Sequence, residues 1–169
     1  LKKSGISLSF DEVLGQRKSP YAPVHSMHIS RTAVKKGYAP DAFTFQRNFL
    51  SYGCDAYSGI GRPSPETAVE VITACGGFAS LAHPGRIELE KQELIALVKR
   101  LVSKGLKGIE AEYSAHTSLQ TAYYTQLAKE YNLSVTGGSD THFQGGNKKI
   151  GTPVFDCGEE LCEKLGLYS

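Results

Sequence analysis

The spacing of apolar and polar residues changes near residue 63. Beyond this point, stretches with apolar residues three or four apart alternate with short apolar runs that end at glycine or proline. The first pattern is typical of amphipathic helices and the second of buried strands. The pattern predicts helices over residues 64–77, 88–105 and 116–132, and strands over 78–84, 106–113 and 133–140. This alternation is typical of a parallel α/β sheet or barrel.

The residues before position 63 are predicted to form short helices joined by irregular segments. Ser9 and Glu12 have the spacing of a capping box at a helix start. Residues 25–38 and 40–53 each read as a helix that ends at a glycine. We therefore expect a helical subdomain over residues 1–62 and an α/β domain over residues 63–169, which closes with a further helix.

Composition and charge narrow the class of protein. Of the 169 residues, 40% are hydrophobic and 21% are charged, as in soluble globular proteins. A net charge of +2 is too small to indicate a nucleic-acid surface by itself. No apolar run approaches the ~20 residues that span a bilayer, and the first residues lack the pattern of a signal peptide. We expect a cytoplasmic protein without a membrane partner, whose cysteines are reduced and buried.

Polar and ionisable residues follow each of the three predicted strands. In parallel α/β folds, active sites lie at the carboxyl ends of the strands. The groups at these three ends are His83, then Glu110, Glu112 and His116, and then Asp140 and His142. Because these residue types lie at three neighbouring strand ends, they suggest a metal site. The alternative is that each of them belongs to an ordinary polar turn.

Asp140 and His142 are two residues apart, so on an extended segment their side chains point to the same side. His83, at a neighbouring strand end, could face the same point. One carboxylate and two imidazoles suit zinc, manganese or iron. The alternatives are a polar turn at 139–142 and a structural His83, while Glu110 could instead make a buried hydrogen bond.

A second set of residues is positively charged. His28 and Arg31 are three residues apart on a predicted helix, and Arg86 closely follows His83. Arginine is well suited to bind phosphate through its planar fork of donors. Each of these residues alone could be a solvated charge. Beside a metal site they suggest a phosphate ester as substrate.

Several segments resemble the PHP family, the polymerase and histidinol phosphatase domain. The resemblance is carried by "GGFASLAHPGR", "GLKGIEAEYSAHT" and "LAKEYNLSVTGGSDTHF", and it covers nearly the whole chain. The segments "HISRTAVKKGY" and "AFTFQRNFLSYG" are similar to the helical insertion of the stand-alone phosphoesterase branch. That branch includes nucleoside 3′,5′-bisphosphate phosphatases and RNA 5′-end exonucleases. The resemblance implies an α/β fold, an irregular (βα)7 barrel whose site holds two or three metals.

The resemblance also implies roles for individual residues. It implies that His83, Asp140 and His142 are metal ligands and carry the catalysis. Arg86 and Arg31 match positions expected to bind substrate phosphate, and His28 and His116 are expected near the substrate. The implied substrate is a phosphorylated nucleotide or an RNA or DNA end.

The family's opening "HxDxH" motif is absent from this sequence. The chain therefore resembles the C-terminal part of a PHP phosphoesterase with its helical insertion. We expect it to hold at most one metal, zinc, manganese or iron, and to be weakly active or inactive alone. We also expect it to pair through an exposed sheet edge, either as a homodimer or with a missing N-terminal half.

Three other functions remain open. The first is a non-catalytic PHP-like module that binds or supports a partner. The second is a histidinol-phosphate phosphatase, against which the helical insertion argues by resemblance. The third is a metal-dependent amidohydrolase, although Arg31 and Arg86 favour an anionic substrate.

Overall fold

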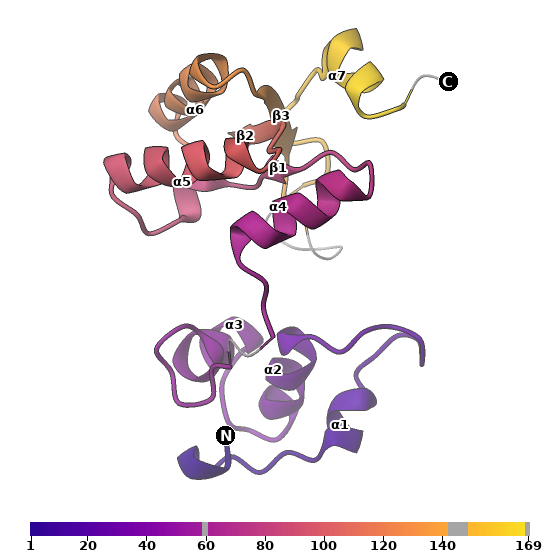
Figure 1. Ribbon diagram of the computed structural model, residues 1–169. Helices are drawn as coiled ribbons and strands as arrows, with labels where there is room; N and C mark the ends of the chain where they lie inside the picture. The colour runs from indigo at the N-terminus through magenta and orange to yellow at the C-terminus, as the bar shows by residue number, and fades with distance from the viewer. Residues whose placement is uncertain (59–60, 142–148, 168–169) are drawn as a thin grey trace. The chain divides into compact units, whose positions relative to one another are not determined.

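The chain folds into two units, Leu1–Arg62 and Pro63–Ser169 (Figure 1). The computed structural model describes residues 1–58, 61–141 and 149–167. The predicted ligand His142 lies outside the described residues. Among the described residues, no helix has the length and apolarity needed to cross a membrane.

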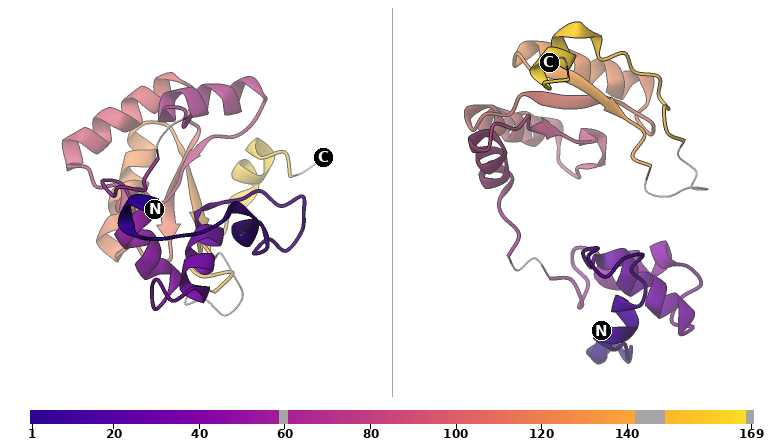
Figure 2. Two further views of the ribbon diagram at one scale, coloured as in Figure 1. Left: turned by 90° about the horizontal axis from the view of Figure 1, so that it is seen from below. Right: turned by 90° about the vertical axis from the view of Figure 1, so that its right-hand side faces the viewer.

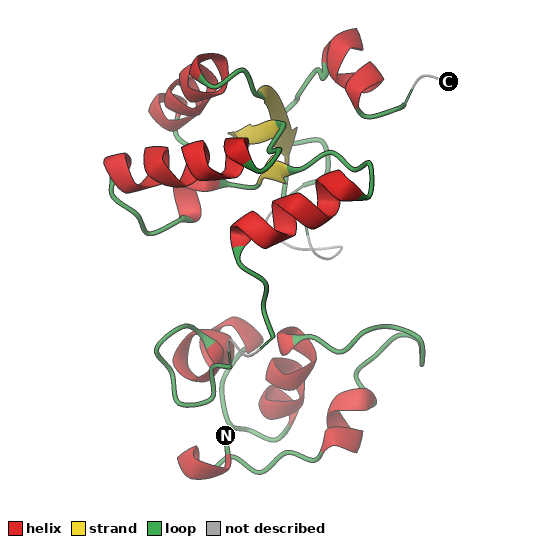
Figure 3. Cartoon of the chain, viewed as in Figure 1, coloured by secondary structure: helices red, strands yellow, loops and turns green. Residues whose placement is uncertain are grey.

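The described part of the N-terminal unit contains helices and loops only (Figure 3). Its elements are a 3₁₀ turn, η1 (Lys2–Ser4), the α-helices α1 (Phe10–Leu14), α2 (Ser26–Lys35) and α3 (Ala42–Phe45), and a π-helical turn, η2 (Gln46–Leu50). The helix predicted over residues 40–53 is found from Ala42 to Leu50, but its second half is π-helical and it ends before Ser51. Ser51 is extended, and its hydroxyl donates to the Gln46 carbonyl at 3.2 Å, which caps the wide turn and ends it.

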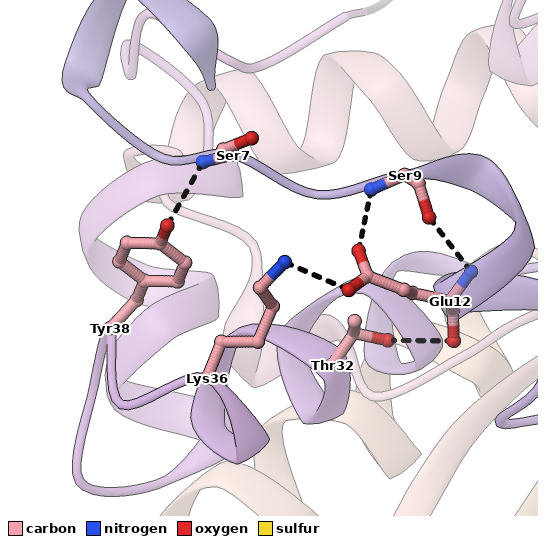
Figure 4. A network of polar contacts seen from close by, with 6 residues as sticks. All are labelled: Ser7, Ser9, Glu12, Thr32, Lys36 and Tyr38. Atoms are coloured by element: carbon pink, nitrogen blue, oxygen red, sulfur yellow. Dashed lines mark hydrogen bonds and ion pairs between the residues drawn. The ribbon is translucent and has the colours of Figure 1, made fainter.

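Ile6, Ala33 and Phe45 are the buried members of the apolar cluster of this unit, and partly buried apolar residues pack against them. A polar network joins α1 to α2 beside them (Figure 4). The predicted capping box is confirmed, because Ser9 and Glu12 each accept a backbone N–H from the other. Glu12 also binds Lys36 at 2.8 Å. Charge and capping therefore fix a short helix that its own length would not stabilise.

The C-terminal unit is built on a parallel three-stranded sheet in the order β1-β2-β3. Its strands are β1 (Ser80–Leu81), β2 (Gly108–Tyr113) and β3 (Ser134–Gly138), and its helices are α4 (Pro65–Ala74), η3 (Pro84–Arg86), α5 (Lys91–Ser103), α6 (Ser118–Glu130) and α7 (Gly158–Lys164). The predicted α/β rhythm is confirmed. The first strand is shorter than expected, because His83 adopts a left-handed conformation and Pro84 then starts a 3₁₀ turn.

One face of this sheet is apolar and carries the core. Ile109 and Ala111 of β2 pack with apolar residues of α5 and α6, among them Val98, Leu101 and Leu127. Figure 2 shows the strands side by side with these helices packed along them. The alternate positions of the strands are polar, and Ser80 and Thr136 join hydroxyls at 2.8 Å across β2. The helices therefore cover one face and leave polar groups on the other.

The cysteines depart from expectation in one respect. All four are free thiols, but Cys75 is exposed and only Cys162 is fully buried. Cys75 follows the last turn of α4, beyond the apolar stripe of that helix. The sulfurs of Cys157 and Cys162 lie 2.8 Å apart at the start of α7.

Candidate functional site

The three strand ends of the C-terminal unit meet in a cluster of polar side chains. Tyr113 ends β2, and Asp140 lies two residues beyond β3. The Tyr113 hydroxyl donates to Asp140 Oδ2 at 3.0 Å. Arg86, from the turn after β1, places Nη1 3.2 Å from the Tyr113 hydroxyl and 3.3 Å from Asp140 Oδ2. Arg86 and Tyr113, which are 27 positions apart in the sequence, thus both donate to Oδ2 of Asp140.

Tyr113 and Asp140 also set the electrostatics of Arg86. The interactions with Tyr113, and then the charge of Asp140, raise the pKa of Arg86, so they favour its cationic form. The Arg86 side chain is 60% exposed and the Asp140 side chain 17%. An ion pair this exposed contributes little to stability. The guanidinium is therefore held near the cluster while much of it still faces solvent.

The backbone at two predicted metal ligands is unusual. His83 has φ 31° and Asp140 has φ 54°, and both values are in the left-handed region that residues other than glycine rarely adopt. The His83 N–H donates to the Glu110 carboxylate, and its ring lies 5.5 Å from that of Tyr113. Left-handed residues that the surrounding structure holds in place are enriched at functional sites.

His116 is engaged by the backbone through both of its ring nitrogens. Nε2 accepts the Gly85 N–H at 3.2 Å, and Nδ1 lies 2.9 Å from the Ala111 carbonyl oxygen. The ring stands between Tyr113 and Tyr124, with centroids 4.9 Å from each. The sequence predicts a residue near substrate phosphate here. In this arrangement, the ring contacts the turn that carries Arg86, and its role toward phosphate stays a prediction.

His28 and Arg31, the other predicted phosphate-binding residues, belong to the N-terminal unit. His28 is buried on α2, and its Nδ1 accepts the His25 N–H at 3.2 Å. Burial, and then the positive charges of His25, Arg31 and Arg17, lower the pKa of His28. Arg31 is exposed on the same helix. The predicted phosphate-binding role of His28 and Arg31 stays a prediction.

Two of the three predicted metal ligands, His83 and Asp140, lie within the described residues. His83 and Asp140 both lie against Tyr113. The described ranges contain no group of three His, Cys, Asp or Glu side chains placed to hold a metal ion. An imidazole and a carboxylate suit zinc, manganese or iron, and His142 would supply the third predicted donor. The donor types at the strand ends therefore fit such a metal.

Tyr113 has a role in this cluster that the sequence did not indicate, since it joins Arg86 to Asp140. Glu110 accepts the backbone N–H of His83, which is a hydrogen bond of the kind that the sequence left open for it. Both residues lie in the "GIEAEY" segment at the predicted end of a strand. Tyrosine is not a residue type that a metal site requires, so the segment did not single out Tyr113.

A cavity of about 400 Å³ adjoins the cluster. Tyr113 and His116 line it, together with Ser114, Thr121 and Thr152. Its lining is rich in hydroxyl groups. This space lies on the β2 side of the site, next to the residues that hold Arg86.

Comparison with known proteins shows what this chain is similar to. No protein-family model matches it. The 3′,5′-nucleoside bisphosphate phosphatase of Chromobacterium violaceum is 29% identical over 152 residues, which are 89% of this chain and 53% of that protein. A 5′-3′ exoribonuclease of Haemophilus influenzae is 30% identical over 152 residues, which are 89% of this chain and 54% of that protein. The chain spans about half the length of the curated relatives it matches.

Solved structures show the same partial match. An amidohydrolase from Chromobacterium violaceum, with bound sulfate and no metal, matches with a TM-score of 0.74 and 28% identity over 90% of this chain and 54% of that one. A protein assigned as a metal-dependent phosphoesterase, from Bifidobacterium adolescentis, matches with a TM-score of 0.79 and 22% identity over 97% of this chain and 57% of that one. The second match shows the fold alone. The homologues of this chain are PHP-type phosphoesterases, and it corresponds to part of their length.

Proposed function

We propose that this chain contributes a metal-dependent phosphoesterase site that acts on phosphate esters of nucleotides or nucleic-acid ends. The observation that carries the proposal is the cluster at the strand ends, where Arg86 and Asp140 meet through Tyr113. It combines a cation suited to phosphate with a carboxylate suited to a metal. The names of the relatives, a nucleoside bisphosphate phosphatase and an exoribonuclease, supply the substrate class.

In this proposal, His83, Asp140 and His142 hold a zinc, manganese or iron ion. A metal bound there would polarise a phosphoryl oxygen and lower the pKa of a bound water. Arg86 binds the phosphate oxygens that do not react. Arg31 and His28, on α2 of the N-terminal unit, are proposed separately as phosphate-binding residues. Tyr113 holds the Oδ2 atom of Asp140 and so orients the carboxylate.

The proposal also includes the fold of the larger protein to which this chain is similar. We propose that the three-stranded sheet is part of an irregular (βα)7 barrel and that residues 1–62 are a helical insertion. The two outer strands, β1 and β3, form the edges of the sheet in the described residues. Further strands from a longer protein or from a second copy would pair there. Light scattering of the purified chain tests the second case, which predicts twice the mass of 18.3 kDa.

Metal binding tests the site before hydrolysis does, because the chain spans about half the length of its relatives. The purified chain is titrated with Mn²⁺ and followed by electron paramagnetic resonance, and its zinc is measured by elemental analysis. The His83→Ala and Asp140→Ala variants are each expected to lose the bound metal. His25→Ala, which removes a histidine outside the predicted ligand set, is the matched control. Equal metal content in all four proteins would contradict the assignment.

Phosphate release tests the substrate class. Adenosine 3′,5′-bisphosphate is incubated with the chain and Mn²⁺, and free phosphate is measured. Arg86→Ala is expected to lower the rate at low substrate concentration, because it removes a phosphate contact. Arg100→Ala removes an arginine that pairs with Glu66 between α5 and α4, and it is expected to leave the rate unchanged. Metal binding without phosphate release would favour a non-catalytic PHP-like module.

A metal-dependent amidohydrolase is the second candidate, because one similar solved structure is described as an amidohydrolase. The cationic Arg86 in the cluster argues for an anionic substrate instead. Assaying an amide and a phosphate ester side by side separates the two. Turnover of the amide alone would replace the phosphoesterase proposal.

A further inference from the structure

Three side chains from β2 and the turn after it hold one short loop, His83–Arg86. The ladder between β1 and β2 ends at Leu81, so no strand pairing secures the loop beyond it. Glu110 accepts the His83 N–H, and His116 Nε2 accepts the Gly85 N–H at 3.2 Å. Tyr113 accepts from Arg86. The loop that carries a predicted metal ligand and a predicted phosphate contact is therefore fixed from a neighbouring strand.

Two glycines make room for this arrangement. A Cβ atom on Gly138 would lie 2.8 Å from Glu110 Oε1, and one on Gly85 would lie 2.8 Å from the His116 ring. Neither glycine has a φ in the left-handed region, so backbone conformation does not require glycine at these positions. The close approach of the Glu110 and His116 side chains does. Glycine at positions 138 and 85 therefore leaves the space that the Glu110 and His116 side chains occupy.

The hydrogen bonds of His116 define its tautomer. Because Nε2 accepts the Gly85 N–H, the proton of a neutral ring lies on Nδ1 and donates to the Ala111 carbonyl. The rings of Tyr113 and Tyr124 both lie against the imidazole, with centroids 4.9 Å from it. A ring fixed in this way acts on the loop and not as a direct phosphate donor.

We propose that Glu110 and His116 are positioning residues for the site. They set the backbone of His83–Arg86, and this directs the His83 imidazole toward a divalent metal and the Arg86 guanidinium toward phosphate. The inference rests on the function proposed above. Residues that orient a metal ligand in this indirect way commonly change metal affinity about tenfold or more when they are removed.

The test uses the whole ¹⁵N-labelled chain, with amide exchange at His83 and Gly85 and Mn²⁺ affinity as separate readouts. Glu110→Ala and Gly85→Ala are expected to speed exchange at these amides and to weaken Mn²⁺ binding about tenfold. Glu110→Gln keeps an acceptor for the His83 N–H and is expected to restore both readouts. Glu88→Gln, which removes an exposed carboxylate two residues beyond Arg86, is the matched control and should change neither.

Each outcome is decisive. Faster exchange with unchanged Mn²⁺ affinity would overturn the positioning role and leave the proposed function intact. Wild-type exchange in both Glu110→Ala and Gly85→Ala would show that these contacts do not hold the loop. Imidazole ¹⁵N shifts that report the Nε2–H tautomer would remove His116 from the inference. If the wild-type chain binds no Mn²⁺, the proposed metal site fails and the inference fails with it. Gly85→Ala changes a loop outside the core, so the test survives if Glu110→Ala does not fold.

Discussion

Each unit contains a cluster of a carboxylate, a cation and a tyrosine hydroxyl, but the two clusters are built on different secondary structure. In the N-terminal unit, the Glu12 carboxylate binds Lys36 and the Ser9 N–H, while Tyr38 accepts the Ser7 N–H nearby (Figure 4). In the C-terminal unit, Asp140 binds Arg86 and Tyr113 at the ends of parallel strands. The first network closes a helix cap. The second lies at the edge where a parallel sheet places ligands.

The comparison shows that residue types alone do not define a site. Both oxygens of Glu12 are used by the cap and by Lys36, so the network serves the fold. Asp140 and His83 instead take left-handed conformations beside an exposed guanidinium. Backbone conformation and position in the sheet separate the two clusters, and the following predictions test that separation.

Core substitutions should have the largest effects, and each should act on its own unit. Phe45 and Ile109 are both fully buried, in separate cores. Replacing either with alanine is expected to cost about 3–4 kcal/mol. Because Phe45 is the largest of the three buried side chains in the N-terminal cluster, Phe45→Ala should unfold that unit while the other keeps its structure. Residue-resolved hydrogen exchange measures this, and loss of protection in both units would contradict separate cores.

The two tyrosine hydroxyls should differ in importance. Tyr113→Phe removes a largely buried hydroxyl bound to two charged groups and should lower the free energy of unfolding by about 2 kcal/mol. Tyr38→Phe removes an acceptor for one exposed backbone N–H and should cost about 0.5 kcal/mol. Urea denaturation of both variants gives the two values. Equal costs would mean that the two clusters are energetically alike.

Helix caps should contribute equally in the two units. Ser9 and Thr117 each begin a capping box, at α1 and α6. Replacing either with alanine leaves a helix N–H without its partner and should cost about 1 kcal/mol. Thermal unfolding of the two variants checks this. A much larger loss for Ser9→Ala would show that the short α1 depends on its cap more than the longer α6 does.

The smallest effect should be a dependence of stability on pH in the N-terminal unit. The hydrogen bond from Lys36, and then those of the cap, lower the pKa of Glu12 from 4.5 to about 2. Between these pH values, the unfolded chain binds more protons at Glu12 than the folded chain does. This stabilisation is therefore present above about pH 4.5 and lost as the pH falls toward 2. Glu12→Gln should flatten that part of the stability profile, and an unchanged slope would contradict the assignment.

The sequence by itself determined the local structure and the residue types that lie at the strand ends. The cap at Ser9 lies where its spacing from Glu12 predicts, the helix predicted from residue 64 begins at Pro65, and the alternation of helices and strands gives the parallel sheet. His83 and Asp140 follow strand ends, as expected. These features depend on residues close together in the chain, so hydrophobic spacing and capping chemistry suffice to predict them. The metal-binding and phosphate-binding roles of the site residues stay predictions.

Only the tertiary structure decided which side chains meet. Glu110 binds a backbone N–H 27 positions away, and Arg86 and Asp140 are separated by 54. The register of β2 and β3 shifts between Glu110 and Glu112, so Tyr113 lies opposite Gly138, where unbroken pairing would place Glu112. Such a bulge redirects the side chains that follow it. Strand register is set by packing across the whole sheet, and so the central tyrosine became evident only from the fold.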